Sequence, residues 1–306
     1  MAATNWLLFS SAFGVLALAM IARSVGHTEG GPRLQGVAAT APAPAAPLPG
    51  QLRIITWNIA HGRGTSLHQA LLDRAVIRAN LTAIGSALKR EQADLVALQE
   101  ADGPSQWSGH LDQPRLLATG AGLGHRYRGS HGRGLGPVAL DYGTALLSRW
   151  PLDRPRSIRF DRSWRDNKGF VVAGIEIPGS GVVVDVVSLH LDFMSPAVRR
   201  RQVRLLVEEL RDRDRPLIVV GDFNCDLRER GTLSTLVEAL ELQPGTGRGG
   251  PTFPAGQPRR RIDWILVSSD LEIVDHRTLS DPLSDHRAVV ADIALKPDAD
   301  NRRRMP

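Results

Sequence analysis

The sequence predicts an α/β fold, and two observations carry that prediction. Apolar runs of four to eight residues recur at 52–58, 94–98, 182–189 and 217–220, and runs without clean alternation are typical of strands buried on both faces. Residues 73–92 have the spacing of one apolar helix face, which comprises Val76, Ile77, Leu81, Ile84 and Leu88. A chain of 306 residues with 42% hydrophobic content is long enough to bury a core around such elements.

The other expected elements follow in chain order. Glycine-rich stretches at 120–124 and 131–136 predict a mobile loop over a cleft rather than a phosphate-binding fingerprint, because no helix start follows a strand and turn there. Strands are predicted at 139–148, 169–177, 262–267, 272–276 and 288–294, and helices at 195–212 and 233–240. No repeat is visible in the sequence.

The two ends of the chain differ from the middle. Residues 1–24 contain no acidic residue and include an apolar stretch at 6–22 that is broken only by Ser10, Ser11 and Gly14, which predicts a signal peptide or an N-terminal membrane anchor. Residues 25–50 are rich in Ala, Pro and Gly and predict a linker. Residues 51–297 are expected to form one domain, followed by a disordered basic tail at 298–306. We therefore expect export to the periplasm or the cell exterior, with membrane association if the first segment is retained.

Six short polar stretches are the candidates for a functional site, and five of them end an apolar run. Strands that lie side by side in one core bring such ends together, so we expect one cleft. The stretches are Thr56-Trp57-Asn58, Leu98-Gln99-Glu100, Ser188-Leu189-His190-Leu191-Asp192, Gly221-Asp222-Phe223-Asn224, Arg261-Ile262-Asp263-Trp264 and Ser284-Asp285-His286.

Carboxylate, amide and imidazole groups in one cleft suit the hydrolysis of a phosphate diester. That reaction needs a cation to neutralise the non-bridging oxygens, a base for the attacking water, and donors for the charge of the transition state. Hard oxygen ligands favour Mg²⁺, with Mn²⁺ as the alternative, while one cysteine and scattered histidines give no tetrahedral zinc pattern. The sequence therefore predicts a magnesium-dependent phosphodiesterase site.

The residues of these stretches and their order in the chain resemble the motifs of the endonuclease/exonuclease/phosphatase superfamily, which has the fold of deoxyribonuclease I, exonuclease III and bacterial sphingomyelinase. The similarity extends over about residues 52–295, and the stretches 142–151 and 252–254 also resemble family segments. The resemblance implies a four-layer α/β sandwich, in which two packed mixed β-sheets are flanked by helices. It also implies a catalytic role for residues 51–297.

The resemblance implies a role for each matching residue. Glu100 would be the principal metal ligand, with Asn58 fixing the metal shell or the phosphate and Asp285 near the metal. Asp222 would accept a proton from, or orient, the attacking water, and Asn224 would hold the same water or a phosphate oxygen.

Two imidazoles complete the implied catalytic set. His286 would face the scissile phosphate, held by Asp263 through an imidazole-carboxylate hydrogen bond that raises the imidazole pKa. His190 would donate to a non-bridging oxygen or assist the leaving group. Arg261, in the cluster Arg259-Arg260-Arg261, would grip phosphate or an anionic surface.

Several positions have simpler alternatives. Asp222 and Asp263 could cap turns at strand ends, and His190 could be a hydrogen-bonded core histidine. Asp192 could bind metal or substrate, orient a neighbour, or only start a turn. Cys225 among carboxylates is expected to be unreactive packing filler, because acidic neighbours raise a thiol pKa.

Two positions depart from family patterns and narrow the function, and the role of His61 nearby is open. Ala60 stands where exonuclease III-type abasic-site nucleases carry Asp, so a repair role is disfavoured. Thr144 replaces an Asn and puts phosphate contacts there in doubt. His61 is either a substrate contact or a loop histidine without a role.

The expected function is that of an exported metal-dependent phosphoesterase with no obligate protein partner. The alternatives are a deoxyribonuclease I-like endonuclease, a sphingomyelinase-like phospholipid hydrolase, and a non-catalytic phosphate-binding module. A nucleic-acid substrate would require an Arg- and aromatic-lined groove, and Trp107, Trp150 or Trp164 could serve either this groove or a lipid-facing surface. A phospholipid substrate would require exposed apolar loops near the cleft. The cluster Arg199-Arg200-Arg201 is expected on a solvated helix face.

Overall fold

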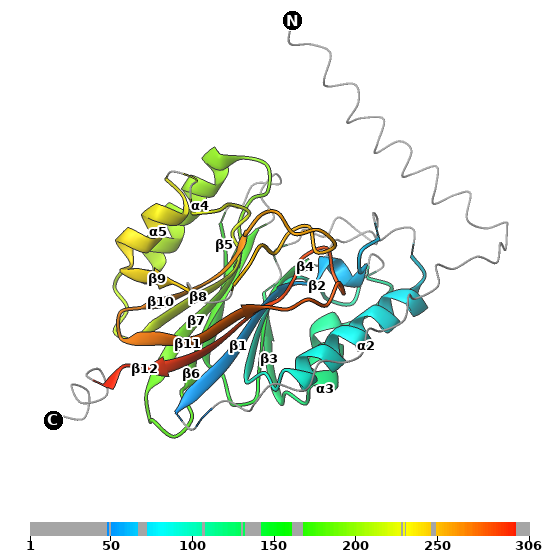
Figure 1. Ribbon diagram of the computed structural model, residues 1–306, viewed down its shortest axis with the longest axis horizontal. Coiled ribbons are helices and arrows are strands. Elements are labelled where there is room, and N and C mark those ends of the chain that lie inside the picture. The colour runs from blue at the N-terminus through cyan, green and yellow to red at the C-terminus, as the bar shows by residue number, and fades with distance from the viewer. Residues whose placement is uncertain are drawn as a thin grey trace, which may run out of the picture. The chain divides into compact units, whose positions relative to one another are not determined.

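Two β-sheets packed face to face form the centre of the protein, with helices on both outer faces (Figure 1). The computed structural model describes residues 48, 50–66, 72–105, 108–129, 131, 142–160, 168–227, 229, 231–245 and 249–297. Each sheet has six strands within these residues. The predicted α/β sandwich is therefore confirmed.

The first sheet is built around two parallel strands, β1 (Gln51–Asn58) and β2 (Leu95–Asp102). Their residues run in register from Ile54 opposite Leu95 to Asn58 opposite Gln99, so both strands end at the same edge. The strand order is β11-β12-β1-β2-β4-β3. The outer strands are β3 (His125–Arg128), β4 (Tyr142–Ser148), β11 (Leu271–Thr278) and β12 (Val289–Leu295).

The second sheet has a similar centre, the parallel pair β7 (Val183–His190) and β8 (Leu217–Asp222). His190 lies opposite Asp222 in this pair, and Asp222 also lies opposite Asp263, the first residue of antiparallel β10. The strand order is β5-β6-β7-β8-β10-β9. The remaining strands are β5 (Asp153–Arg159), β6 (Gly169–Glu176), β9 (Leu242–Pro244) and β10 (Asp263–Ser268).

Three layers of apolar side chains separate the four layers of backbone. α2 (Arg74–Arg90) and α3 (Gln113–Ala121) pack on the first sheet, and α4 (Pro196–Leu210) and α5 (Leu233–Ala239) pack on the second. Successive residues of β1 alternate between two of these cores, with Ile54 between the sheets and Ile55 beneath α2. This double burial explains why the strand sequences are apolar without alternation.

Local signals start and stop the helices at defined residues. The hydroxyl of Ser195 accepts a hydrogen bond from Val198 N at 3.4 Å, and Pro196 follows as the first residue of α4. The carboxylate of Asp112 caps α3 in the same way, accepting from Arg115 N at 3.1 Å. Gly122 ends α3 in a left-handed conformation that glycine adopts without strain.

Several predicted elements need correction. The region around residues 120–124 is not a loop over a cleft, because Gly120 and Ala121 end α3 and a strand, β3, follows. β5 was also not predicted, since its sequence Asp-Arg-Pro-Arg-Ser-Ile-Arg has little apolar signal. Val76 is 40% exposed and does not belong to the buried face of α2.

Some sequence-based predictions fall outside the described residues. They concern the segments 1–24 and 298–306, most of the linker 25–50, the glycine-rich stretch after His131, and Trp107 and Trp164. Among the residues that the structure does describe, no helix is long and apolar enough to cross a membrane.

A buried ion pair ties β1 to β12. The guanidinium of Arg53 donates from Nε and Nη2 to the two carboxylate oxygens of Asp292 at 2.6 and 2.7 Å, and also from Nη1 to the carbonyl of Glu91 at 3.1 Å. Arg53 is 4% exposed, so its charge depends on these partners.

We predict that Asp292→Ala lowers the free energy of unfolding by about 3–5 kcal/mol, because it leaves the buried Arg53 charge without its carboxylate. Arg154→Ala is the matched control, since Arg154 is 84% exposed and lies 3.9 Å from Asp153; a change within about 0.5 kcal/mol is expected. Urea unfolding followed by circular dichroism measures both. Equal stability of the two variants would contradict the assignment.

Candidate active site

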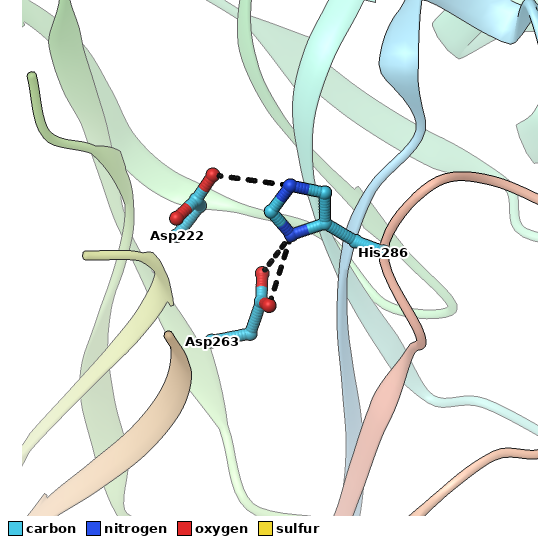
Figure 2. A group of neighbouring side chains, drawn as sticks. All are labelled: Asp222, Asp263 and His286. Carbon is cyan, nitrogen blue, oxygen red and sulfur yellow. Dashed lines mark hydrogen bonds and ion pairs between the residues drawn. The ribbon is translucent and has the colours of Figure 1, made fainter. Parts of the chain in front are cut away.

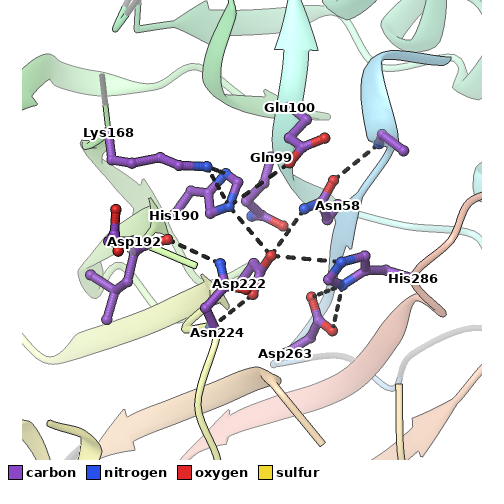
Figure 3. Close-up of polar contacts among 12 residues, drawn as sticks. Asn58, Gln99, Glu100, Lys168, His190, Asp192, Asp222, Asn224, Asp263 and His286 are labelled. Atoms are coloured by element: carbon purple, nitrogen blue, oxygen red, sulfur yellow. Dashed lines mark hydrogen bonds and ion pairs between the residues drawn. The ribbon is translucent and has the colours of Figure 1, made fainter. Parts of the chain in front are cut away.

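The carboxyl ends of the central strands of both sheets meet in one polar cluster. β1 contributes Asn58, β2 contributes Glu100, β7 contributes His190 and β8 contributes Asp222, as Figure 3 shows. Beneath them, Gln99 Nε2 donates to Thr56 Oγ1 and Ser188 Oγ, both at 3.2 Å, and so links the two sheets.

Asp222 lies at the centre of this cluster and is 1% exposed. Asn58 Nδ2 donates to its Oδ2 at 3.0 Å, and the backbone N–H of Asn224 donates to its Oδ1 at 2.9 Å. The nearest ring nitrogens of His190 and His286 lie 3.4 and 3.8 Å from Oδ2. Burial raises the pKa of Asp222, although the neighbouring His286 opposes this effect.

Gly221 allows β8 to approach β7 closely just before Asp222. Its φ is +144°, and a Cβ at this position would collide with the carbonyl oxygen of Leu189. Only glycine satisfies both the conformation and the contact.

His286 and Asp263 form the hydrogen-bonded pair that the sequence predicts (Figure 2). His286 Nδ1 lies 3.0 and 3.2 Å from the two carboxylate oxygens of Asp263. Burial alone would lower the pKa of His286, but the carboxylates of Asp263 and Asp222 outweigh it and raise this pKa to about 10. The ring is therefore an imidazolium whose Nε2 faces Asp222. Trp57 Nε1 donates to the His286 carbonyl at 3.0 Å and so fixes the backbone of His286.

Glu100 is held by a histidine whose role the sequence left open. His61 Nε2 lies 3.2 Å from Glu100 Oε2, and its Nδ1 lies 2.8 Å from the buried carboxylate of Asp102. Burial alone would raise the pKa of Glu100, but nearby cations, His61 foremost, hold it well below its ordinary value. Glu100 is thus ionised.

The contact between His61 and Glu100 depends on local backbone geometry. Both residues are left-handed, with φ of 57° and 51°, and Glu100 sits at an irregularity in the pairing of β2 with β4. Gln113 braces the arrangement by donating to the His61 carbonyl at 2.7 Å and accepting from Asp102 N at 3.0 Å. Non-glycine residues in this conformation concentrate at functional sites.

His190 is paired with a lysine that sequence reasoning missed. Lys168 Nζ lies 2.7 Å from Nε2 and 3.0 Å from Nδ1 of the ring. Burial and then the Lys168 charge lower the pKa of His190 well below its ordinary value, so this imidazole is neutral. The only signal in the sequence was the position of Lys168 directly before β6, whose first residue Gly169 lies opposite His190.

Two predicted site residues have other partners. The backbone N–H groups of Met194 and Ser195 both donate to Asp192 Oδ1, at 3.0 and 2.6 Å. This arrangement corresponds to the alternative in which Asp192 starts a turn. The carboxylate of Asp285 pairs with Arg63. The roles proposed for Asp192 and Asp285 remain predictions.

Arg261 points away from the cleft. Its guanidinium stacks on Trp264 at 4.1 Å, and Nη2 donates to the Gly245 carbonyl at 2.7 Å and lies 3.1 Å from His276 Nε2. Its predicted phosphate contact would require these interactions to break. The exposed member of the cluster beside the site is Arg260, which donates to the Asn224 carbonyl at 3.4 Å.

Two further expectations concern the edges of the site. Thr144 Oγ1 lies 3.1 Å from His131 Nε2, and both residues line a small cavity beside Glu100 and Lys168. Within the cluster Arg199-Arg200-Arg201, the last two residues are exposed on α4 as predicted, but Arg199 is 4% exposed and pairs with Glu229 at 2.5 Å. The prediction that Arg199 lies on a solvated helix face is wrong.

The site offers donors for a hard metal ion. Asp222, Asp263 and His286 place one ligand atom each within 4.8 Å of one another. However, Asp263 uses both oxygens on a His286 ring that is already protonated, so these two residues do not suit a cation. The carboxylates of the ionised Glu100 and of Asp222 do fit an oxygen-coordinated ion such as Mg²⁺, whereas Asn58 turns its amide nitrogen to Asp222 and its Oδ1 accepts from Ala60 N at 3.0 Å.

Cys225 is 1% exposed, and burial raises the pKa of its thiol to about 12. We therefore predict that maleimide leaves the folded protein unmodified at neutral pH but labels it quantitatively in urea. Intact mass spectrometry before and after denaturation measures this difference. Rapid labelling of the native chain would contradict the packing role.

Comparisons with known proteins show what the chain is similar to. The model of the Endonuclease/Exonuclease/phosphatase family matches residues 55–286. The uncharacterized protein YbhP of Escherichia coli is 32% identical over 164 residues, which cover 50% of this chain and 63% of that protein. The match thus spans less than two thirds of YbhP.

Solved structures show the same fold. An endonuclease/exonuclease/phosphatase structure from Beutenbergia cavernae superposes with a TM-score of 0.61 at 24% identity, covering 80% of this chain and 72% of that chain. The mannosyl-6-phosphatase of Bacteroides thetaiotaomicron superposes with a TM-score of 0.63 at 16% identity, covering 80% of this chain and 100% of that chain.

Proposed function

The chain belongs to the endonuclease/exonuclease/phosphatase family, whose members hydrolyse phosphate esters, and we propose that it is an exported, metal-dependent phosphoesterase that cleaves a phosphodiester with water. The observation that carries this proposal is the buried Asp222 carboxylate between two imidazoles of opposite protonation, the neutral His190 and the cationic His286. Groups with such divergent pKa values typically divide acid and base roles.

Glu100 is the residue that would hold the ion, with Asn58 and Asp222 beside it. When bound, Mg²⁺ or Mn²⁺ supplies charge neutralisation at the non-bridging phosphate oxygens and acidifies water. His61 and Asp102 fix one oxygen of Glu100 and so orient the carboxylate.

The chain's own groups account for the proton movements. Asp222 accepts a proton from the attacking water, since burial raises its pKa toward the range in which a carboxylate is an effective base. His286 presents a proton on Nε2 to the phosphate, and Asp263 keeps that ring oriented. His190 contacts a non-bridging or leaving oxygen with the Lys168 ammonium beside it, which adds positive charge where negative charge develops.

A non-catalytic phosphate-binding module is the less favoured alternative. Such a module needs charge complementarity alone, whereas this site buries an acid, orients an imidazolium with a second acid, and holds Glu100 in a strained backbone conformation. Strain and buried charge are costly features that catalysis explains.

We predict that Glu100→Gln and His286→Gln each lower kcat/KM for bis(p-nitrophenyl) phosphate at least about 100-fold, because each removes a charge that acts in the transition state. Glu176→Gln, an exposed residue at the far end of β6, is the matched control and should retain wild-type turnover. Chelator should abolish the activity of the wild type, and Mg²⁺ or Mn²⁺ should restore it.

Circular dichroism melting curves establish that the variants remain folded. Near-normal turnover by a folded Glu100→Gln variant, or full wild-type activity in chelator, would contradict the proposed function.

Export is proposed from the first 24 residues of the sequence. Fusion of residues 1–50 to alkaline phosphatase lacking its own signal should give active phosphatase in a bacterial periplasm, because that enzyme is active only after export. The matched control is a fusion of residues 25–50 alone, which keeps the linker but lacks the apolar stretch. Equal activity of the two fusions would contradict export by this segment.

A further inference from the structure

The turn between β7 and α4 exposes two adjacent large apolar side chains beside the site. Phe193 is 66% exposed and Met194 is 67% exposed, and His190 at the end of β7 lies only a few residues before them. Isolated exposed apolar residues are ordinary, but adjacent ones next to a functional site indicate a contact surface.

Hydrogen bonds hold the backbone of this turn in a defined conformation. Asp192 Oδ1 accepts from the N–H groups of Met194 and Ser195, and Gln202 Oε1 accepts from Asp192 N at 2.8 Å. Arg199 Nη1 donates to the Asp192 carbonyl at 2.9 Å. α4 thus holds the turn from behind, and the apolar side chains project from a fixed backbone.

A second loop, joined to the turn and to α4 by a hydrogen bond and an ion pair, exposes another apolar residue. Asn224 Nδ2 donates to the Leu191 carbonyl at 3.0 Å, and the Arg199–Glu229 pair joins α4 to the loop after Asn224. Leu227 in that loop is 43% exposed. We call Phe193, Met194 and Leu227 the apolar tip.

Arginines flank the apolar tip. Arg200, Arg201 and Arg204 are exposed on α4, and Arg260 is exposed beside Asn224. Exposed guanidinium groups therefore occur on α4, which directly follows the turn, and beside Asn224, whose side chain bonds to the Leu191 carbonyl.

The acids near the apolar tip do not cancel this charge. The carboxylate of Asp192 serves the turn, and that of Glu229 pairs with Arg199. Asp226, next to Leu227, is exposed. Backbone donors do not cancel the charge of Asp192, so two carboxylates, Asp192 and Asp226, face the four exposed arginines, and among the described residues this surface carries a net positive charge.

We propose that the apolar tip and its flanking arginines form a docking surface for a bilayer that contains anionic phospholipids. Apolar side chains inserted at the boundary between headgroups and acyl chains, combined with arginines at headgroup level, are the features of interfacial binding. The surface would act whether or not the protein is catalytic. If the proposed function also holds, docking would present a phosphate ester of the bilayer to the cleft.

The composition of the apolar tip favours a bilayer over a single-stranded nucleic acid. Base stacking requires aromatic faces in series along a basic groove, whereas the tip has one aromatic ring and two aliphatic side chains. Leu and Met gain free energy from entering hydrocarbon and offer no stacking platform.

A position-specific fluorescence experiment on the full chain tests the proposal. Met194→Cys is labelled with an environment-sensitive maleimide dye, and the buried Cys225, whose pKa is raised to about 12, leaves the new thiol as the reactive one. Val274→Cys, at a position 51% exposed on edge strand β11, is the matched control. Both proteins are mixed with vesicles of phosphatidylglycerol and phosphatidylcholine in equal parts.

We expect dye emission at position 194 to rise about twofold or more as the dye leaves water, with no rise at position 274. Vesicles of phosphatidylcholine alone should give a weaker response because the arginines then lack anionic partners. An unchanged signal at 194 in protein that sediments with the vesicles would overturn the proposal, as would equal responses at both positions. A response to a single-stranded oligonucleotide instead of vesicles would assign the surface to nucleic acid and overturn it too.

A double variant separates docking from catalysis. Phe193→Ser with Met194→Ser should weaken vesicle binding about tenfold, through the apolar area it removes, while hydrolysis of a soluble phosphodiester stays at the wild-type rate. Unaltered vesicle binding by this variant would count against the docking surface. A wild type that binds vesicles but hydrolyses no phosphodiester would leave docking intact and refute only the proposed function.

Discussion

The buried carboxylate of Asp222 is stabilised by partners from both sheets, and the other groups of the cleft are arranged around it. Asn58 from the first sheet donates to it, and His286, which precedes β12 of the same sheet, faces it, while His190 comes from the neighbouring strand of its own sheet. A buried acid without such partners would be unfavourable. The cleft is therefore assembled only when the two sheets pack against each other.

The sequence predicted those parts of the fold whose burial is complete. β1, β2, β7 and β8 are apolar on both faces, so their runs stand out. β5 and α3 were missed for the opposite reason: β5 is an edge strand with charged residues and a proline, and α3 contains Thr119 and Gly120 near its end. Such elements form because packing against the neighbouring layers outweighs their weak intrinsic propensity for helix or strand.

A similar reason explains which residues of the candidate site could be predicted from the sequence and which could not. Asn58, His190 and Asp222 end buried strands, Glu100 lies near the end of one and His286 lies shortly before one, so topology alone brings them together. The contacts of His61 and Lys168 depend on a left-handed turn and on the spacing of separate strands, which no local pattern encodes. Asp192 shows the reverse case, because its carboxylate serves the turn that supports the apolar tip.

Gly221 shows how a residue without a functional group can govern chemistry at its neighbour. A methyl group at this position would collide with the Leu189 carbonyl and act as a wedge between β7 and β8. Asp222 and His190 would then move apart, since each ends one of these strands. The distance between Asp222 and His190 thus depends on the lack of a side chain at position 221. Replacement of this glycine would disable the cleft even though every reactive side chain is still present.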